Sequence, residues 1–290
     1  MADKKFPVIG TMRLGSWGAN LAPGEVARFL SACVELGCVD IDLADIYGDH
    51  TVNTLVGRAL AEAPELKTAC RLIAKVGIAR KCDAFPGRKI NYYDSSAHAL
   101  KSAIDASFEE LGVDQVEMLM IHRFDYLTDA AAVAEAITPY LKNDQAARFG
   151  VSNYAPLELD LLRDVLPVTA NQIQLSLSHI DPVLDGSMAA FQARNCEVMA
   201  WSPLGGGAAF DADNEVGARV APVADEIAAR HGATRSQVYF AWINAFAIAR
   251  PVLGTAQIDR VKEAVDAIDL RLDHEEWYRL LEAGRGRGVD

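Results

Sequence analysis

The chain has 290 residues, of which 51% are hydrophobic and 23% charged, and its 28 basic and 40 acidic side chains give a formal charge of −12. This composition can build a large hydrophobic core, which excludes disordered and fibrous proteins. The negative charge opposes nucleic acids and anionic membranes as main partners. The length fits one large α/β barrel or two ordinary domains.

The five cysteines are scattered and none forms a Cys-x-x-Cys pair, so neither a disulfide framework nor a structural zinc site is indicated. The first residues lack the apolar run of a signal peptide. The longest uncharged stretch, about 236–249, is too short to span a bilayer. We therefore expect a soluble, cytoplasmic protein without a membrane partner.

Eight short apolar runs recur along the chain, each rich in Val, Ile, Leu or Ala and without strict polar alternation. Strands that are buried on both faces have this pattern. We predict strands at Phe6–Thr11, Cys38–Leu43, Arg71–Val76, Val116–His122, Ala147–Ser152, Val168–Gln174, Cys196–Trp201 and Ile248–Gly254.

Amphipathic segments lie between these runs and predict helices. Ser96 is suited to cap one of them, and Gly112 to end it. The predicted helices are Glu25–Leu36, Ser96–Leu111, Pro156–Val165, Pro222–Arg230, Thr234–Phe246, Asp259–Ile268 and Asp273–Leu281.

Strand and helix alternate around eight strands with no Pro- or Gly-rich linker, which predicts a parallel (β/α)8 barrel as one domain over residues 1–290. A doubly wound sheet is the alternative fold. It usually begins with a Gly-rich first turn, and Phe6–Gly18 contains no Gly-x-Gly-x-x-Gly.

Polar side chains stand where several of the predicted strands end. Asp42 and Tyr47 come with the second strand, Lys75 with the third and His122 with the fourth. In a (β/α)8 barrel the carboxyl ends of all strands meet at one rim, so we expect these four side chains to converge. Burying such a cluster is costly unless its charges pair and serve a chemical purpose.

These four residue types suit the reduction of a carbonyl group. Tyrosine, with a pKa of about 10, is a poor acid at neutral pH, and a neighbouring ammonium lowers that pKa. We therefore predict Tyr47 as a general acid whose pKa Lys75 lowers, with Asp42 holding Lys75 and His122 orienting the carbonyl oxygen. The hydride must come from a cofactor, because no side chain supplies one.

Six sequence blocks in the same order, from about Val8 to Leu281, resemble the aldo/keto reductases. Each lies at a predicted strand end. They read Asp42-Leu43-Ala44-Asp45-Ile46-Tyr47-Gly48, Ile73-Ala74-Lys75, Leu119-Met120-Ile121-His122-Arg123, Arg148-Phe149-Gly150-Val151-Ser152-Asn153, Asn171-Gln172-Ile173-Gln174 and Ala200-Trp201-Ser202-Pro203-Leu204-Gly205.

The resemblance implies a barrel oxidoreductase that reduces small aldehydes or ketones with NADPH, with NADH as an alternative, and a monomer. It implies Asp42, Tyr47, Lys75 and His122 as the catalytic set. It implies that Ser152, Asn153 and Gln172 bind the nicotinamide carboxamide and that Trp201 stacks on the ring. The remaining implied cofactor contacts are Ser202, Leu204 and Gly205 along the pyrophosphate, and Gly254, Thr255, Gln257 and Arg260 at the adenosine phosphate.

The sequence departs from the family pattern at several positions. Ala256 and Gln257 stand where many members carry another basic residue, which leaves Arg260 as the main phosphate ligand and favours NADPH. Phe124 follows His122-Arg123 where proline is common, and the chain after the last predicted helix is short, which predicts an open pocket.

Two other functions stay open at this point. A Schiff-base aldolase would use Lys75 as its nucleophile, although a paired lysine is poorly tuned for that role. A cofactor-binding regulatory subunit with little turnover would keep the same four residues.

Overall fold

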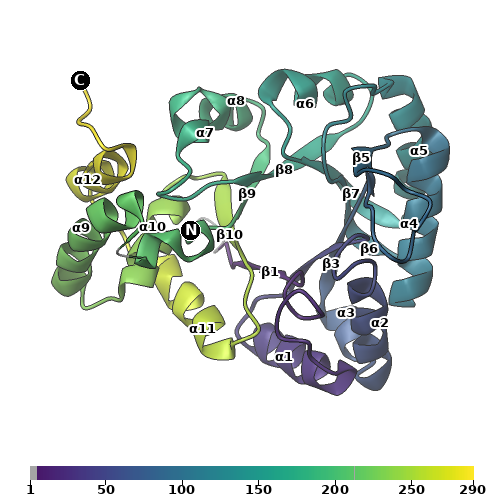
Figure 1. Cartoon of the computed structure of the whole chain (residues 1–290), viewed down its shortest axis with the longest axis horizontal. Coiled ribbons are helices and arrows are strands. Elements are labelled where there is room, and N and C mark those ends of the chain that lie inside the picture. The colour runs from purple at the N-terminus through teal and green to yellow at the C-terminus, as the bar shows by residue number, and fades with distance from the viewer. Residues whose placement is uncertain (1–4, 212) are drawn as a thin grey trace. The chain divides into compact units, whose positions relative to one another are not determined.

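The computed structural model describes residues 5–211 and 213–290. Eight parallel strands close into a barrel in the order β1-β10-β9-β8-β7-β6-β3-β2, with helices outside (Figure 1). The predicted (β/α)8 barrel is confirmed, and each predicted strand overlaps one barrel strand. The barrel strands are β1 (Val8–Gly10), β2 (Asp40–Ala44), β3 (Arg71–Val76), β6 (Val116–Ile121), β7 (Ala146–Ser152), β8 (Val168–Gln174), β9 (Glu197–Trp201) and β10 (Ala249–Leu253).

The predicted helices are present, and their ends follow local chemistry. The α4 helix begins after Ser96, whose Oγ accepts from the Ala99 N–H, and ends at Gly112 with φ of 62°. The α-helices are α1 (Pro23–Glu35), α2 (Val52–Glu62), α3 (Leu66–Ala69), α4 (Ala97–Leu111), α5 (Ala130–Lys142), α6 (Pro156–Arg163), α7 (Asp181–Leu184), α8 (Ser187–Ala193), α9 (Glu215–His231), α10 (Arg235–Asn244), α11 (Ile258–Asp266) and α12 (His274–Arg285). Two 3-10 turns are η1 (Gly205–Phe210) and η2 (Ala267–Asp269).

One predicted helix start is wrong. The sequence pattern placed it at Pro222, whereas α9 begins at Glu215 and carries Pro222 inside. The Asn214 side chain accepts the N–H groups of Val216 and Gly217 and so caps the true start. A proline inside a helix loses one backbone hydrogen bond, and here the cap and the buried apolar face of α9 outweigh that loss.

A short two-stranded sheet was not predicted. It pairs β4 (Ile78–Ala79) with β5 (Tyr92–Tyr93) in antiparallel fashion, just after β3. Strands of two residues carry no periodicity, so the sequence pattern gives no sign of them. The chain between them, residues 80–91, forms a long exposed loop that takes part in the site described below.

The chain divides into two compact units, which we describe separately. The N-terminal unit contains Val8–Gln172 and Gly254–Ile258, and the C-terminal unit contains the residues up to Pro7, Ile173–Leu253 and Asp259–Asp290. None of the helices in the described part of the chain is both long and apolar enough to cross a membrane.

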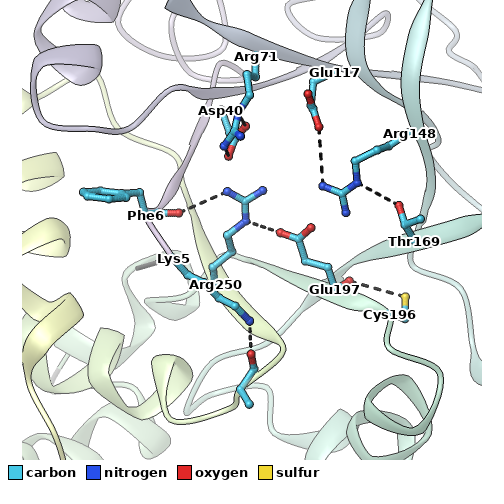
Figure 2. Close-up of polar contacts among 11 residues, drawn as sticks. Lys5, Phe6, Asp40, Arg71, Glu117, Arg148, Thr169, Cys196, Glu197 and Arg250 are labelled. Atoms are coloured by element: carbon cyan, nitrogen blue, oxygen red, sulfur yellow. Dashed lines mark hydrogen bonds and ion pairs between the residues drawn. The ribbon is translucent and has the colours of Figure 1, made fainter. Parts of the chain in front are cut away.

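Charged side chains near the amino ends of the N-terminal unit's strands are held in pairs. Arg71 donates two parallel hydrogen bonds of 2.8 Å to the carboxylate of Asp40. Arg148 lies 4.0 Å from Glu117 and donates to the Thr169 hydroxyl at 3.3 Å (Figure 2). The bidentate Arg71–Asp40 pair fixes the starts of β2 and β3 together, and we assign both sets of contacts to the scaffold.

The C-terminal unit has a similar arrangement. Arg250, 7% exposed, pairs with the Glu197 carboxylate and donates to the backbone oxygen of Phe6 at 3.5 Å (Figure 2). Lys5 donates to the backbone oxygen of Ala247. These contacts tie the first described residues of the chain to β9 and β10.

Candidate active site

The structure brings Asp42, Tyr47, Lys75 and His122 together within the N-terminal unit. Strand pairing accounts for this, because Ala44 of β2 lies opposite Lys75 of β3, and Lys75 lies opposite Met120 of β6. Asp42 is therefore two residues before the position that faces Lys75, and His122 follows the last residue of β6. All four side chains are buried.

Asp42 is the centre of the polar contacts. Its Oδ1 forms an ion pair with the Lys75 ammonium and accepts a hydrogen bond of 2.8 Å from Gln172 Nε2. Its backbone oxygen accepts from the Thr11 hydroxyl at 2.8 Å. Lys75 is fully buried, so burial lowers the pKa of its ammonium while Asp42 opposes that change.

Tyr47 is arranged differently from the prediction. Its hydroxyl donates to Asp42 Oδ2 over 3.5 Å, and the Lys75 ammonium lies 5.1 Å from the centre of its ring. Burial, followed by the negative charge of Asp42, raises the pKa of Tyr47 well above its ordinary value. The expected lowering by Lys75 is wrong for this arrangement, because desolvation and the carboxylate dominate. Tyr47 therefore keeps its proton.

His122 lies at the same rim, and its surroundings favour the neutral imidazole. Burial lowers its pKa well below the ordinary value, and the cations Lys75 and Arg123 add to the effect. Its ring lies 5.9 Å from that of Tyr47 at an interplanar angle of 84°. Its Nδ1 is buried without a hydrogen-bond partner among the described residues. Because this nitrogen has no accessible surface, a ligand can reach His122 only through its other ring nitrogen, Nε2.

The three residues predicted to hold the nicotinamide carboxamide also lie in this unit. The Ser152 hydroxyl donates to the backbone oxygen of Gln172 at 2.9 Å, and Asn153 Nδ2 lies 2.8 Å from Ser152 Oγ and 3.3 Å from the backbone oxygen of His122. Gln172 Nε2 is engaged with Asp42. These side chains link the ends of β7 and β8 to the group formed by Asp42, Tyr47, Lys75 and His122, which we call the tetrad. Their cofactor contacts remain a prediction.

The sequence did not predict a cluster of three side chains beside Tyr47. It consists of Trp17, Asp49 and Arg80, and we call it the polar wall. The Trp17 ring lies 6.4 Å from the Tyr47 ring, and its Nε1 donates to Asp49 Oδ2 at 3.2 Å. Arg80 donates to Asp49 Oδ1 at 2.6 Å and places its guanidinium 4.5 Å from the Trp17 ring centre. These residues come from three separate loops, which no local pattern could connect.

Asp45 is a second buried carboxyl near the tetrad. Its backbone N–H donates to the Lys75 oxygen at 3.0 Å, and its Oδ1 is buried without a partner in the described structure. Burial raises its pKa to about 7. The sequence showed Asp45 only as a neighbour of Asp42, because burial depends on packing.

The C-terminal unit carries the residues predicted for the cofactor's ring and pyrophosphate. Trp201 ends β9, and Ser202 follows with φ of 50°. The next glycines have φ of 61° at Gly205, 67° at Gly206 and 106° at Gly207. Only glycine adopts such a run readily, and it leaves the backbone uncovered, since a Cβ at Gly206 or Gly207 would meet nothing within 4 Å.

The residues predicted for the adenosine phosphate lie around the start of α11. Thr255 Oγ1 accepts from the Gln257 N–H at 3.0 Å, and Arg260 is exposed in the first turn of the helix. Arg260 has no hydrogen-bond or ion-pair partner among residues 5–211 and 213–290.

Comparisons with known proteins show the family of this chain. The model of the aldo/keto reductase family matches residues 8–285. The chain is 32% identical over 285 residues to the 6-dehydroglucose reductase of Agrobacterium fabrum, covering 97% of this chain and 95% of that protein. It is 34% identical over 288 residues to the oxidoreductase YdhF of Escherichia coli, covering 97% and 94%. The chain belongs to the aldo/keto reductase family.

Solved structures confirm the fold. A thermostable aldo-keto reductase crystallised with the inhibitor epalrestat superposes with a TM-score of 0.78 at 21% identity, covering 97% of both chains. An aldo/keto reductase from Klebsiella pneumoniae, crystallised with NADP and acetate, gives a TM-score of 0.74 at 22% identity and covers 94% of this chain and 89% of that one. The chain is therefore an oxidoreductase of this family built on its barrel.

Proposed function

We propose that this chain reduces small aldehydes or ketones to alcohols with NADPH. The observation that carries the proposal is that the buried Tyr47 hydroxyl lies beside the Asp42–Lys75 pair and next to His122. When bound, the reduced nicotinamide would supply a hydride to the carbonyl carbon.

The proton comes from the chain. A carbonyl oxygen near Tyr47 and His122 gains negative charge as the carbon is reduced, and it becomes basic enough to take the Tyr47 proton. The Lys75 ammonium, 5.1 Å from the Tyr47 ring centre, stabilises the phenolate left behind. His122 positions the carbonyl oxygen by donating a hydrogen bond from Nε2, because its Nδ1 has no surface that a ligand could reach.

The residues present fit a dinucleotide. The glycine run in the C-terminal unit leaves backbone uncovered, as close approach of a pyrophosphate requires. The exposed, unpaired Arg260 at the start of α11 fits a phosphate, since both the helix end and the guanidinium attract an anion. We propose the remaining predicted contacts, including Trp201 on the ring, as this cofactor's binding residues.

The substrate class is suggested by relatives. Two of them, from Agrobacterium fabrum and Novosphingobium aromaticivorans, are named 6-dehydroglucose reductase and are 32% and 30% identical to this chain. We propose an aldehyde or ketone on a hydroxylated carbon chain as the substrate. The polar wall of Trp17, Asp49 and Arg80 beside Tyr47 supports this, because hydroxyl groups pair well with such side chains.

The test is the substitution Tyr47→Phe. We expect reduction of aldehydes to be abolished while NADPH binding, followed by fluorescence titration, is retained. Tyr92→Phe, which changes an exposed tyrosine of the same unit, serves as the matched control and should leave both unchanged. Undiminished turnover in the Tyr47 variant would refute the proton donor assigned here.

Titration with NADPH and NADH in parallel tests the cofactor. We expect NADPH to bind more tightly, and Arg260→Ala to remove that preference with little effect on NADH. Tight NADPH binding without turnover across a panel of reactive aldehydes would instead favour a regulatory subunit. A covalent adduct on Lys75, trapped with borohydride, would favour an aldolase.

A further inference from the structure

The segment that follows His122 is held firmly at the rim of the N-terminal unit. The His122 N–H donates to the Val76 oxygen at 2.8 Å, and Asn153 Nδ2 donates to the His122 oxygen at 3.3 Å. Two residues further on, the buried Asp125 accepts from both the backbone N–H and the hydroxyl of Ser95, at 2.9 and 3.0 Å.

The aromatic residue in this segment is fixed as well. The Phe124 ring packs edge-on against two tyrosine rings. Its centre lies 5.3 Å from that of Tyr154 and 6.1 Å from that of Tyr126. Contacts therefore hold the backbone on both sides of Arg123, and they fix the position of its Cα directly after His122.

Arg123 itself is different from its neighbours. It is partly buried, yet none of its five N–H donors has an acceptor, and no carboxylate pairs with it, anywhere in the described residues. Other partly buried arginines of the same unit, such as Arg80 and Arg148, are paired. A partly desolvated guanidinium without a partner is costly for folding alone.

The charge of Arg123 reaches the reacting groups. It lowers the pKa of His122, and it acts against the rise in the pKa of Tyr47. Coulomb interactions weaken with distance, and these effects fit the position of Arg123 directly after His122 in the chain.

We propose that Arg123 binds an oxygen of the substrate other than the one being reduced, and so selects carbonyl compounds that carry a hydroxyl or carboxylate group near the carbonyl. The inference rests on the proposed reductase function. Its chemistry follows from the guanidinium fork, which matches oxygen acceptors and carboxylates above all. An unsubstituted aldehyde offers no second oxygen, so the guanidinium stays unpaired and contributes no binding energy.

The experiment compares two matched pairs of aldehydes with NADPH: propanal against glyceraldehyde, and butanal against succinic semialdehyde. The variant is Arg123→Met, with Arg123→Lys as the conservative change. Arg58→Met, which alters an exposed arginine on α2 of the same unit, is the control. Unfolding midpoints and NADPH affinity of every variant are measured alongside.

We expect Arg123→Met to lower kcat/KM for an oxygenated aldehyde by about 10- to 100-fold, mainly through KM, because a hydrogen bond to a charged group is lost. Propanal and butanal should change by less than about threefold, on the argument that they make no contact with the guanidinium. Arg123→Lys should recover part of the loss. A loss on glyceraldehyde alone assigns a hydroxyl, and a loss on succinic semialdehyde alone assigns a carboxylate.

Equal losses on all four aldehydes, or none, would overturn the assignment. Absence of turnover in the unaltered chain would be a failure of the proposed function instead. In that case binding of butyrate and of its amide, butyramide, to the NADPH-loaded chain is measured by calorimetry. Weaker butyrate binding in Arg123→Met, with butyramide unchanged, supports Arg123 as the oxygen-binding residue, and unchanged butyrate binding refutes it.

Discussion

Asp45 gives the sharpest quantitative prediction, because its carboxyl is buried beside the tetrad. Burial, aided by Glu110, raises its pKa from 3.8 to about 7, while the Ile46 N–H, Arg88 and Lys75 act in the opposite direction. The folded pKa exceeds the unfolded value, so the unfolded chain releases this proton first as the pH rises. The free energy of unfolding therefore falls between about pH 4 and about pH 7. Above that range the folded chain bears the full cost of ionising the buried Asp45 carboxyl.

The size of the effect follows from the shift. The shift would cost about 4 kcal/mol in full, since each pKa unit is worth about 1.4 kcal/mol, and about 2.5 kcal/mol of this cost would develop between about pH 5 and about pH 8. Asp45 is partly accessible to water, which screens the charge, so we expect roughly 1–2 kcal/mol. Asp45→Asn keeps the shape and removes the charge. Its stability relative to the unaltered chain should rise by that amount between about pH 5 and about pH 8.

Urea unfolding at the two pH values measures this difference. Asp83→Asn, at an exposed position in the 80–91 loop, removes the same charge without burial and should show no such pH dependence. An Asp45→Asn advantage that stays constant with pH, or that shrinks as the pH rises, would show that the carboxyl ionises normally in the folded chain.

Two further predictions concern the site. Gln172→Leu removes the 2.8 Å hydrogen bond to Asp42 Oδ1 and the amide that we propose contacts the nicotinamide carboxamide, so we expect kcat and NADPH affinity, read by fluorescence, both to fall by about 10-fold. Gly205→Ala would place a Cβ 2.1 Å from Ser178 Oγ at a φ of 61°, so we expect weaker NADPH binding in the same titration. Gly232→Ala shares a φ of 62° but meets open space, and equal effects of the two would contradict a role for the Gly205 loop.

The fold and the tetrad could be predicted from sequence for one physical reason. Strands buried on both faces read as apolar runs, and the first polar residue after such a run marks the strand end. Lys75 and His122 were located in this way, and parallel pairing then placed them beside Asp42. Local signals also fixed helix ends where the cap was specific, as at Ser96 and Gly112.

What sequence could not give depends on packing between distant segments. The direction of the Tyr47 pKa change follows from burial and from the orientation of its hydroxyl toward Asp42. Neither can be inferred from the spacing of residues in the sequence. The Trp17–Asp49–Arg80 wall joins three loops whose paths are set by the barrel. The predicted start of α9 at Pro222 is wrong, because the Asn214 side chain caps the helix at Glu215 and Pro222 lies inside it.

The charged side chains at the two ends of the strands show how the barrel separates stability from chemistry. Arg71 and Arg250, near strand starts, are paired with carboxylates, so removing a partner there should cost folding energy first. Beyond strand ends, Arg123 and Arg260 have no hydrogen-bond or ion-pair partners among the described residues. Donors left unpaired in a folded chain gain their interaction energy only when a ligand arrives. Neutral substitutions at these positions should therefore be tolerated by the fold and felt in binding, which is the behaviour that distinguishes a site from its scaffold.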